Sequence, residues 1–226
     1  MYNIEDFDSL FSFWKDLTPS QKEFLAKSAT TVRFPAGNLI QRSDGTCRGI
    51  MAVLSGSLRV YCVSEEGREV TLYRVEGGDV CILSASCLMD SIVFDILIEA
   101  VSETTVCIIP SGALHKVEEE NPLVELFVYK NATEKFSEVL WTIQQLLFMK
   151  IDQRIGTFLH DESLRQKSNI LSIRHEDIAK EIGSVREVVT KTLKYLADEG
   201  AISLGRGRIE ILDKKRLART MQRKGE

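Results

Sequence analysis

The chain has 226 residues, of which 44% are apolar and 27% are charged, and its formal net charge is −4. This length and apolar content suffice to bury a sizeable core, which we expect to be divided between two domains. The sequence has no run of about 18–20 uncharged apolar residues, so no membrane partner is expected. An acidic start without a basic segment argues against a secretory signal, and five cysteines without a Cys-x-x-Cys pair favour a reducing cytoplasm.

Short helices are predicted for residues 4–30. Thr18 is placed to cap one of them, because Pro19 suits a first helical turn and Gln21 can complete a capping box. Residues 31–110 change to short β-rich runs, separated by glycine turns at a spacing of roughly ten residues. The predicted strands are 50–54, 58–63, 69–75, 96–101 and 105–109. This pattern indicates an antiparallel sandwich or roll.

A long helix is predicted near residues 122–150. Six of its apolar side chains follow the alternating spacing of a coiled-coil seam, namely Tyr129, Ala132, Phe136, Val139, Ile143 and Leu146. A second apolar stripe lies at a different angle and consists of Leu123, Leu126, Phe127, Leu140 and Leu147. A helix that is apolar on two sides is either buried within one domain or lies between its own domain and another subunit. We favour the second arrangement, with the seam as a homodimer interface.

Residues 175–212 have the order of parts of a winged helix-turn-helix. A short amphipathic helix ends at Gly183, since glycine takes a left-handed turn without steric cost. Ser184 is expected to cap the next helix. That helix should bury a stripe made of Val188, Val189, Leu193 and Leu196. Residues 202–211 then alternate like two strands around a glycine turn with two arginines at its tip, as in a DNA-facing wing.

The opposite face of the second helix carries side chains that can reach base edges and phosphates, namely Arg186, Glu187, Thr190 and Lys191. A glycine between amphipathic helices also occurs in small helical bundles, so this pattern alone is weak. The charge distribution strengthens it. Residues 151–226 carry 16 Lys and Arg against 12 Asp and Glu, whereas residues 1–150 carry 13 against 21. The C-terminal part is therefore predicted to bind double-stranded DNA.

The whole chain resembles the Crp–Fnr family of bacterial transcription regulators. The resemblance rests on FPAGNLI, IMAVLSGSLRVYCVSEEGREVTLYRVEGGDV and EIGSVREVVTKTLKYLADEGAI, which come in the family's order around the long helix. It implies an α+β fold. An antiparallel β-roll (a jelly roll of the cyclic-nucleotide-binding type) with flanking helices would span residues 1–120, a long dimerisation helix 121–150, and a winged helix-turn-helix 151–226. Residues 148–152 would form the hinge, with Asp152 as the cap of the next helix.

Family members that read TGTGA-type half-sites begin the recognition helix with Arg-Glu and place a basic residue four positions after the glutamate. By this resemblance Arg186, Glu187 and Lys191 read the bases of a palindromic site, with Arg186 suited to guanine and Glu187 to cytosine. Lys191 departs from the more usual arginine and loses its bidentate fork. Phosphate contacts are assigned to Ser184, Thr190, Arg206 and Arg208. The structural alternative for Glu187 is an acid that complements the helix dipole.

The sensor half departs from the family members that bind cyclic AMP, which place an arginine against the cyclic phosphate. Residues 76–105 contain no Arg or Lys, and a buried phosphate without a cation would be costly. Cyclic AMP is therefore not expected as the effector. The segment holds Cys81, Ser84, Ser86 and Cys87. Three interpretations stay open for it: inert packing, thiol or metal sensing, and the lining of a pocket for an uncharged or aromatic effector.

An iron–sulfur cluster of the Fnr kind is disfavoured because no cysteine precedes Cys47. Haem bound through a cysteine stays a minor alternative, and no cofactor is assigned. No catalytic motif is found, so the chain is not expected to be an enzyme. The prediction is a cytoplasmic homodimeric regulator, an activator or a repressor, that contacts RNA polymerase and responds to a small-molecule or redox effector. A ligand-binding module without a regulatory switch is the alternative.

Overall fold

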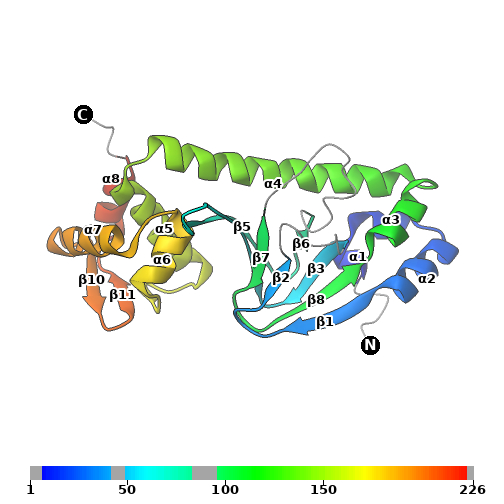
Figure 1. Cartoon of the computed structure of the whole chain (residues 1–226), viewed down its shortest axis with the longest axis horizontal. Coiled ribbons are helices and arrows are strands. Elements are labelled where there is room, and N and C mark those ends of the chain that lie inside the picture. The colour runs from blue at the N-terminus through cyan, green and yellow to red at the C-terminus, as the bar shows by residue number, and fades with distance from the viewer. Residues whose placement is uncertain (1–6, 42–48, 83–95, 223–226) are drawn as a thin grey trace. The chain divides into compact units, whose positions relative to one another are not determined.

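The computed structural model divides into two compact units (Figure 1). It describes residues 7–41, 49–82 and 96–222. Unit 1 comprises Met1–Cys62 and Leu72–Leu140, and unit 2 comprises Val63–Thr71 and Trp141–Glu226. The division between the units therefore falls inside the long helix rather than at either of its ends.

Unit 1 begins with short helices, as predicted. They are α1 (Phe7–Leu10), a 3-10 helix (Ser12–Asp16) and α2 (Pro19–Ser28). The predicted capping box of α2 is confirmed, because the Gln21 backbone N–H donates to Thr18 Oγ1 at 3.3 Å and the Thr18 N–H donates to Gln21 Oε1 at 3.0 Å. The Phe13 ring lies 5.0 Å from the Phe127 ring, edge to face, so the N-terminal segment packs against the long helix.

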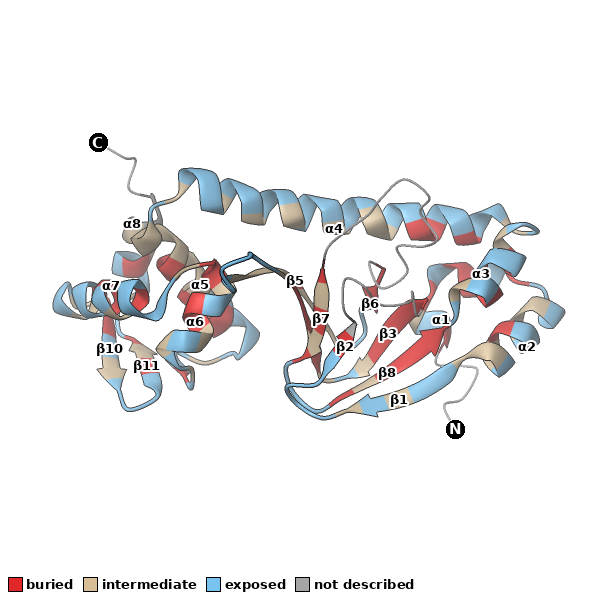
Figure 2. Ribbon diagram, in the orientation of Figure 1, coloured by how far each residue is buried: buried red, intermediate tan, exposed pale blue. Residues whose placement is uncertain are grey.

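Two four-stranded sheets form the β-roll. The first has the order β1 (Thr30–Phe34), β8 (Thr104–Ile109), β3 (Ile50–Ser55) and β6 (Val80–Cys81), and the second has the order β2 (Leu39–Gln41), β7 (Leu97–Ala100), β4 (Ser57–Val63) and β5 (Glu69–Glu76). Four successive residues of β3, Ile50 to Val53, are fully buried, so this strand is covered on both faces. Figure 2 shows the same burial along β3 and β8. The predicted antiparallel roll is confirmed.

Five of these strands match the predicted ones, and three were not predicted. The unpredicted strands are β1, β2 and β6, and each pairs with a strand that is distant in the sequence. β1 pairs with β8 in antiparallel register, with Val32 opposite Val106, and β6 pairs with β3, with Cys81 opposite Met51. A two-residue strand such as β6 has no sequence period of its own to detect.

The helix α3 (Ser111–Glu118) leads into the long helix α4 (Pro122–Phe148), which has almost the predicted bounds. Only Val124, Phe127 and Val128 of α4 are buried, and all three lie near its start. Further along, Ala132 and Val139 pack partly against the core of unit 1. The remaining surface of α4 is mostly exposed, as Figure 2 shows.

Unit 2 contains a core formed by four helices, together with a small three-stranded sheet. Its elements after α4 are α5 (Ile151–Arg165), β9 (Ile170–Leu171), α6 (His175–Ile182), α7 (Arg186–Asp198), β10 (Ile202–Gly205), β11 (Arg208–Ile211) and α8 (Lys214–Gln222). The predicted cap of α5 is wrong. Lys150 precedes the helix and donates its N–H to Gln153 Oε1 at 2.8 Å, which leaves Asp152 inside the first turn. An acid there still complements the helix dipole.

Candidate nucleic-acid interface

The turn between α6 and α7 is built around Gly183. Its φ of 64° lies in the left-handed region, and the N–H groups of Gly183 and Ser184 both return to the Ala179 carbonyl. The predicted glycine turn is therefore confirmed. Ser184 does not cap α7, because the helix begins one residue later, with Val185 in the capping position and no side-chain capping bond. A cap needs its side chain directly before the first turn, and Ser184 stands one residue too early.

Helix α7 packs against unit 2 through one stripe and leaves its other side in solvent. Val189, Leu193 and Leu196 are fully buried, as predicted. Val188 is 40% exposed, so its predicted burial is wrong; adjacent helical residues differ by about 100° in direction, and Val189 takes the inward one. The exposed side presents Arg186, Glu187 and Lys191. Within this side, Glu187 and Lys191 are four residues apart and share a face.

The wing is the hairpin of β10 and β11. Ile202 pairs with Ile211, and Gly205 pairs with Arg208 at the tip. Gly207, the second of the two residues between these strands, has a φ of 66°, a left-handed conformation that glycine adopts without steric cost. Arg206 and Arg208 are exposed. Arg208 Nη2 lies 3.2 Å from Glu210 Oε2 on the same strand, so this carboxylate partly neutralises it.

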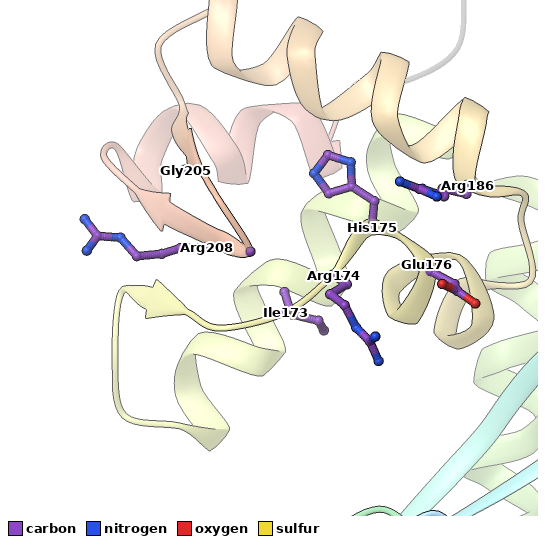
Figure 3. A pocket seen from close by; sticks show the side chains of 8 residues that line it. Ile173, Arg174, His175, Glu176, Arg186, Gly205 and Arg208 are labelled. Carbon is purple, nitrogen blue, oxygen red and sulfur yellow. The ribbon is translucent and has the colours of Figure 1, made fainter.

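A cavity of about 290 Å³ lies between the start of α6, the start of α7 and the wing, and we call it the wing cavity (Figure 3). Two glycines of the wing, Gly205 and Gly207, are part of its lining. Its ionisable lining residues are Arg174, His175, Glu176, Arg186 and Arg208. In Figure 3 the Arg186 side chain points toward the His175 ring, whereas Arg208 points away from it. Cations therefore outnumber carboxylates around a space that opens between the recognition helix and the wing.

His175 is one of the cavity residues that the sequence analysis did not assign to DNA binding, as are Arg174 and Glu176. Its Nδ1 lies 2.9 Å from Thr190 Oγ1 on the recognition helix, so a predicted phosphate ligand is hydrogen-bonded to it. Burial, and then the nearby Arg186 cation, lower the pKa of His175 below its ordinary value. A histidine at the start of the helix before the recognition helix was the only sequence signal available.

Comparison with known proteins identifies both units. Residues 31–121 match the family model of a cyclic nucleotide-binding domain, and residues 153–220 match that of a Crp-like helix-turn-helix domain. A solved structure from Eubacterium rectale, described as a transcriptional regulator of the Crp/Fnr family, is 39% identical with a TM-score of 0.90, and the match covers 94% of this chain and 99% of that one. The chain belongs to the Crp/Fnr family of transcriptional regulators.

Two further relatives come from Thermus thermophilus. The transcriptional regulator SdrP is 29% identical over 206 residues, which are 87% of this chain and 96% of that relative. The cyclic AMP receptor protein is 24% identical over 178 residues, which are 79% of this chain and 82% of that relative. This Crp/Fnr protein is thus a DNA-binding transcription regulator with a cyclic-nucleotide-binding-like domain, and its relatives are regulators rather than enzymes.

In the β-roll of this Crp/Fnr regulator, Cys81 is fully buried on β6. The other three predicted effector residues, Ser84, Ser86 and Cys87, lie outside the described residues. Tyr73 is also buried, and its pKa is well above the ordinary value, first because of burial and then because of the neighbouring Cys81 thiol. The predicted effector segment therefore begins in a packed environment.

A cation from α4 approaches this part of the roll, and the sequence analysis missed it. Lys135 Nζ lies 5.2 Å from the centre of the Tyr73 ring. It is also 2.7 Å from Glu138 Oε1, so its charge is already balanced. Cys107 on β8 is buried as well, and burial raises the pKa of its thiol to about 11. Cys62 is half-buried.

Exposed apolar side chains follow α4 as one row, which we call the α4 seam. Its members are Leu126, Tyr129, Phe136, Leu140, Ile143 and Leu147, each 41–68% exposed. Their spacing alternates between three and four residues if the exposed Thr133 is included. Of the six residues predicted for the interface, Tyr129, Phe136 and Ile143 are in this row, Leu146 is exposed beside it, and Ala132 and Val139 lean toward the core of unit 1.

Within the described part of the chain, no group of three or more His, Cys, Asp or Glu side chains is arranged to hold a metal ion. None of the described helices is long and apolar enough to cross a membrane.

Proposed function

We propose that this Crp/Fnr regulator acts as a homodimer that reads a palindromic DNA site with TGTGA-like half-sites. The observation that carries the proposal is the exposed group of Arg186, Glu187 and Lys191 at the start of α7, next to a wing that ends in two arginines. A major groove admits one helix, and the first turns of that helix reach the base edges.

The side chains divide into base and phosphate contacts. Arg186 has no carboxylate partner among the residues that the structure describes, so its guanidinium is available for guanine. Glu187 is the candidate acceptor for cytosine, and Lys191 extends the same face. The phosphate contacts are assigned to Ser184, Thr190, Arg206 and Arg208, which surround the base-reading group on the turn, the helix and the wing.

The α4 seam is the proposed dimer interface. A palindrome needs two copies of the recognition helix related by a two-fold axis, and an isologous contact supplies that symmetry. We assign residues 1–120 to the effector domain, 121–150 to the dimerisation helix and 151–226 to DNA binding. Ala132 and Val139 pack against the core of unit 1. We infer that one face of α4 packs on its own β-roll and the other face packs on the second protomer.

We further propose that the β-roll senses an effector other than cyclic AMP and thereby repositions the helix-turn-helix. The absence of Lys and Arg from residues 76–105 supports this, as does the pairing of Lys135 with Glu138. Thiol, metal or haem sensing through Cys81 and Cys87 is the alternative mechanism. Contact with RNA polymerase is expected of a regulator of this kind, as is a cytoplasmic location.

The test is a gel-shift comparison of a TGTGA-containing palindrome with random duplex. Arg186→Ala should weaken the specific complex by about 1–3 kcal/mol per half-site and relax preference at one guanine, because a bidentate contact is lost. Arg208→Ala should weaken both duplexes alike and flatten the salt dependence. Arg219→Ala, which removes an exposed arginine of α8, is the matched control and should change neither. Equal losses on both duplexes for Arg186→Ala would remove Arg186 from the base-reading group.

A further inference from the structure

The wing cavity has the composition of an anion site rather than of an apolar pocket. Arg174, Arg186 and Arg208 contribute permanent positive charge, and Glu176 is the single carboxylate among its lining residues. Its volume of about 290 Å³ is several times the roughly 30 Å³ that one water occupies, so a phosphate group with its waters fits. The cavity also lies between the recognition helix and the wing, the two elements to which the DNA contacts are assigned.

His175 lies in this cavity with one ring nitrogen already engaged. The partner of Nδ1 is the Thr190 hydroxyl, which can donate a hydrogen bond or accept one. The bond therefore survives whether the imidazole is neutral or protonated. In the protonated ring Nδ1 donates to Thr190 Oγ1, and Nε2 is left as a second donor for a ligand.

The charges around His175 favour its neutral form when the cavity holds no anion. Arg174 at the start of α6, Arg186 on α7 and Arg208 on the wing are cationic, and Glu176 on α6 is the opposing acid. Burial and Arg186 lower the pKa of His175, so the free protein keeps the ring neutral near pH 7.

Two of these three arginines already form ion pairs with nearby carboxylates. Asp177 Oδ2 lies 3.1 Å from Arg174 Nε, and Glu210 Oε2 lies 3.2 Å from Arg208 Nη2. These carboxylates screen two of the three arginines. Among the described residues Arg186 acts on His175 without such a carboxylate partner. Its positive charge attracts an incoming phosphate, while its guanidinium remains the proposed guanine contact.

We propose that the wing cavity receives one DNA backbone phosphate and that His175 takes up a proton from solvent when it does so. The proposal rests on the DNA-binding function above. It further specifies the group that enters the cavity, the residue that contacts this group and the proton that is taken up on binding. The proton joins the free ring nitrogen, and no covalent bond breaks. Binding then carries a pH dependence that contacts from arginine and lysine do not have.

The sign of the effect follows from linkage. The bound phosphate raises the pKa of His175 above its value in the free protein, so the complex holds more protons than its separated parts. DNA affinity should therefore rise as the pH falls through the bound-state pKa and level off below the free-state pKa. One proton per protomer gives at most about a tenfold gain in affinity per pH unit for each half-site.

The experiment measures the dissociation constant of the full-length protein for its palindrome between about pH 8 and pH 6 at fixed salt. The parent protein should bind more tightly as the pH falls, and His175→Gln should lose most of that slope while still binding at the higher pH. His160→Gln, a change of a half-buried histidine on α5, should retain the parent slope. His175→Arg should bind at the higher pH about as tightly as the parent does at the lower one.

Direct titration separates a DNA phosphate from a free anion. The chain has three histidines, so isotope labelling of histidine gives three ring signals to follow. The palindrome should raise the pKa of His175, and inorganic phosphate at the same phosphate concentration should raise it much less. An equal pH slope in the parent and His175→Gln would overturn the proposal, as would an equal pKa rise with inorganic phosphate at the same phosphate concentration. Failure of the parent to bind any duplex would instead reject the DNA-binding function itself.

Discussion

Replacing Phe136 with Asp should separate the proposed dimer. Phe136 is 56% exposed in the single chain and lies at the centre of the α4 seam. Full burial of such a side chain stabilises by roughly 2–3 kcal/mol, so covering its exposed half contributes about 1–1.5 kcal/mol in each protomer. Twelve seam side chains in a dimer then contribute on the order of 12–18 kcal/mol before the cost of association, which is about 4–15 kcal/mol.

The substitution removes two of these contacts and places two like charges across the symmetry axis. The loss of apolar burial is about 2–3 kcal/mol for the dimer, and the buried carboxylates add several kcal/mol more. The dimer dissociation constant should therefore rise by at least about a thousandfold. Val139→Asp is a poorer test, because Val139 also packs against the core of unit 1 and its loss would disturb the roll.

Sedimentation equilibrium at micromolar concentration checks this expectation, with circular dichroism as a measure of folding. Ser137→Asp is the control, because Ser137 is exposed on α4 next to the seam but outside it. It should stay dimeric. The reasoning is refuted if Phe136→Asp is folded and dimerises with an affinity within about tenfold of the parent, since the interface would then lie elsewhere.

Three further outcomes are expected. Leu193→Ala, at a fully buried position of α7, should destabilise unit 2 by about 2–5 kcal/mol in urea unfolding, whereas Val188→Ala at its exposed neighbour should change stability by less than about 1 kcal/mol; equal effects would contradict the packing of α7. Isothermal calorimetry should detect no cyclic AMP binding in the micromolar range, which corresponds to about −8 kcal/mol. If sensing uses thiols, Cys81→Ser and Cys87→Ser should leave dimerisation intact and make DNA affinity insensitive to oxidant or metal, and an unchanged response in both would assign them to packing.

Short-range patterns in the sequence determined much of this protein. The positive φ of Gly183, the capping box at Thr18 and the bounds of α4 follow from local sterics, local hydrogen bonds and helical periodicity, which act over a few residues. The wing hairpin could be predicted for the same reason, because apolar and polar residues alternate along both of its strands on either side of a glycine turn. Motif order then sufficed to place the chain in its family.

Tertiary structure alone decided which groups meet. β6 exists because β3 lies beside it, and Val188 faces solvent because Val189 takes the inward direction on α7. The contact of His175 with Thr190 joins two helices across a turn, and the approach of Lys135 to Tyr73 joins a helix to a sheet. Such pairings depend on how elements distant in sequence pack and on the rotation of each helix about its axis. Local periodicity specifies that a helix has an apolar face but not which neighbour that face will meet.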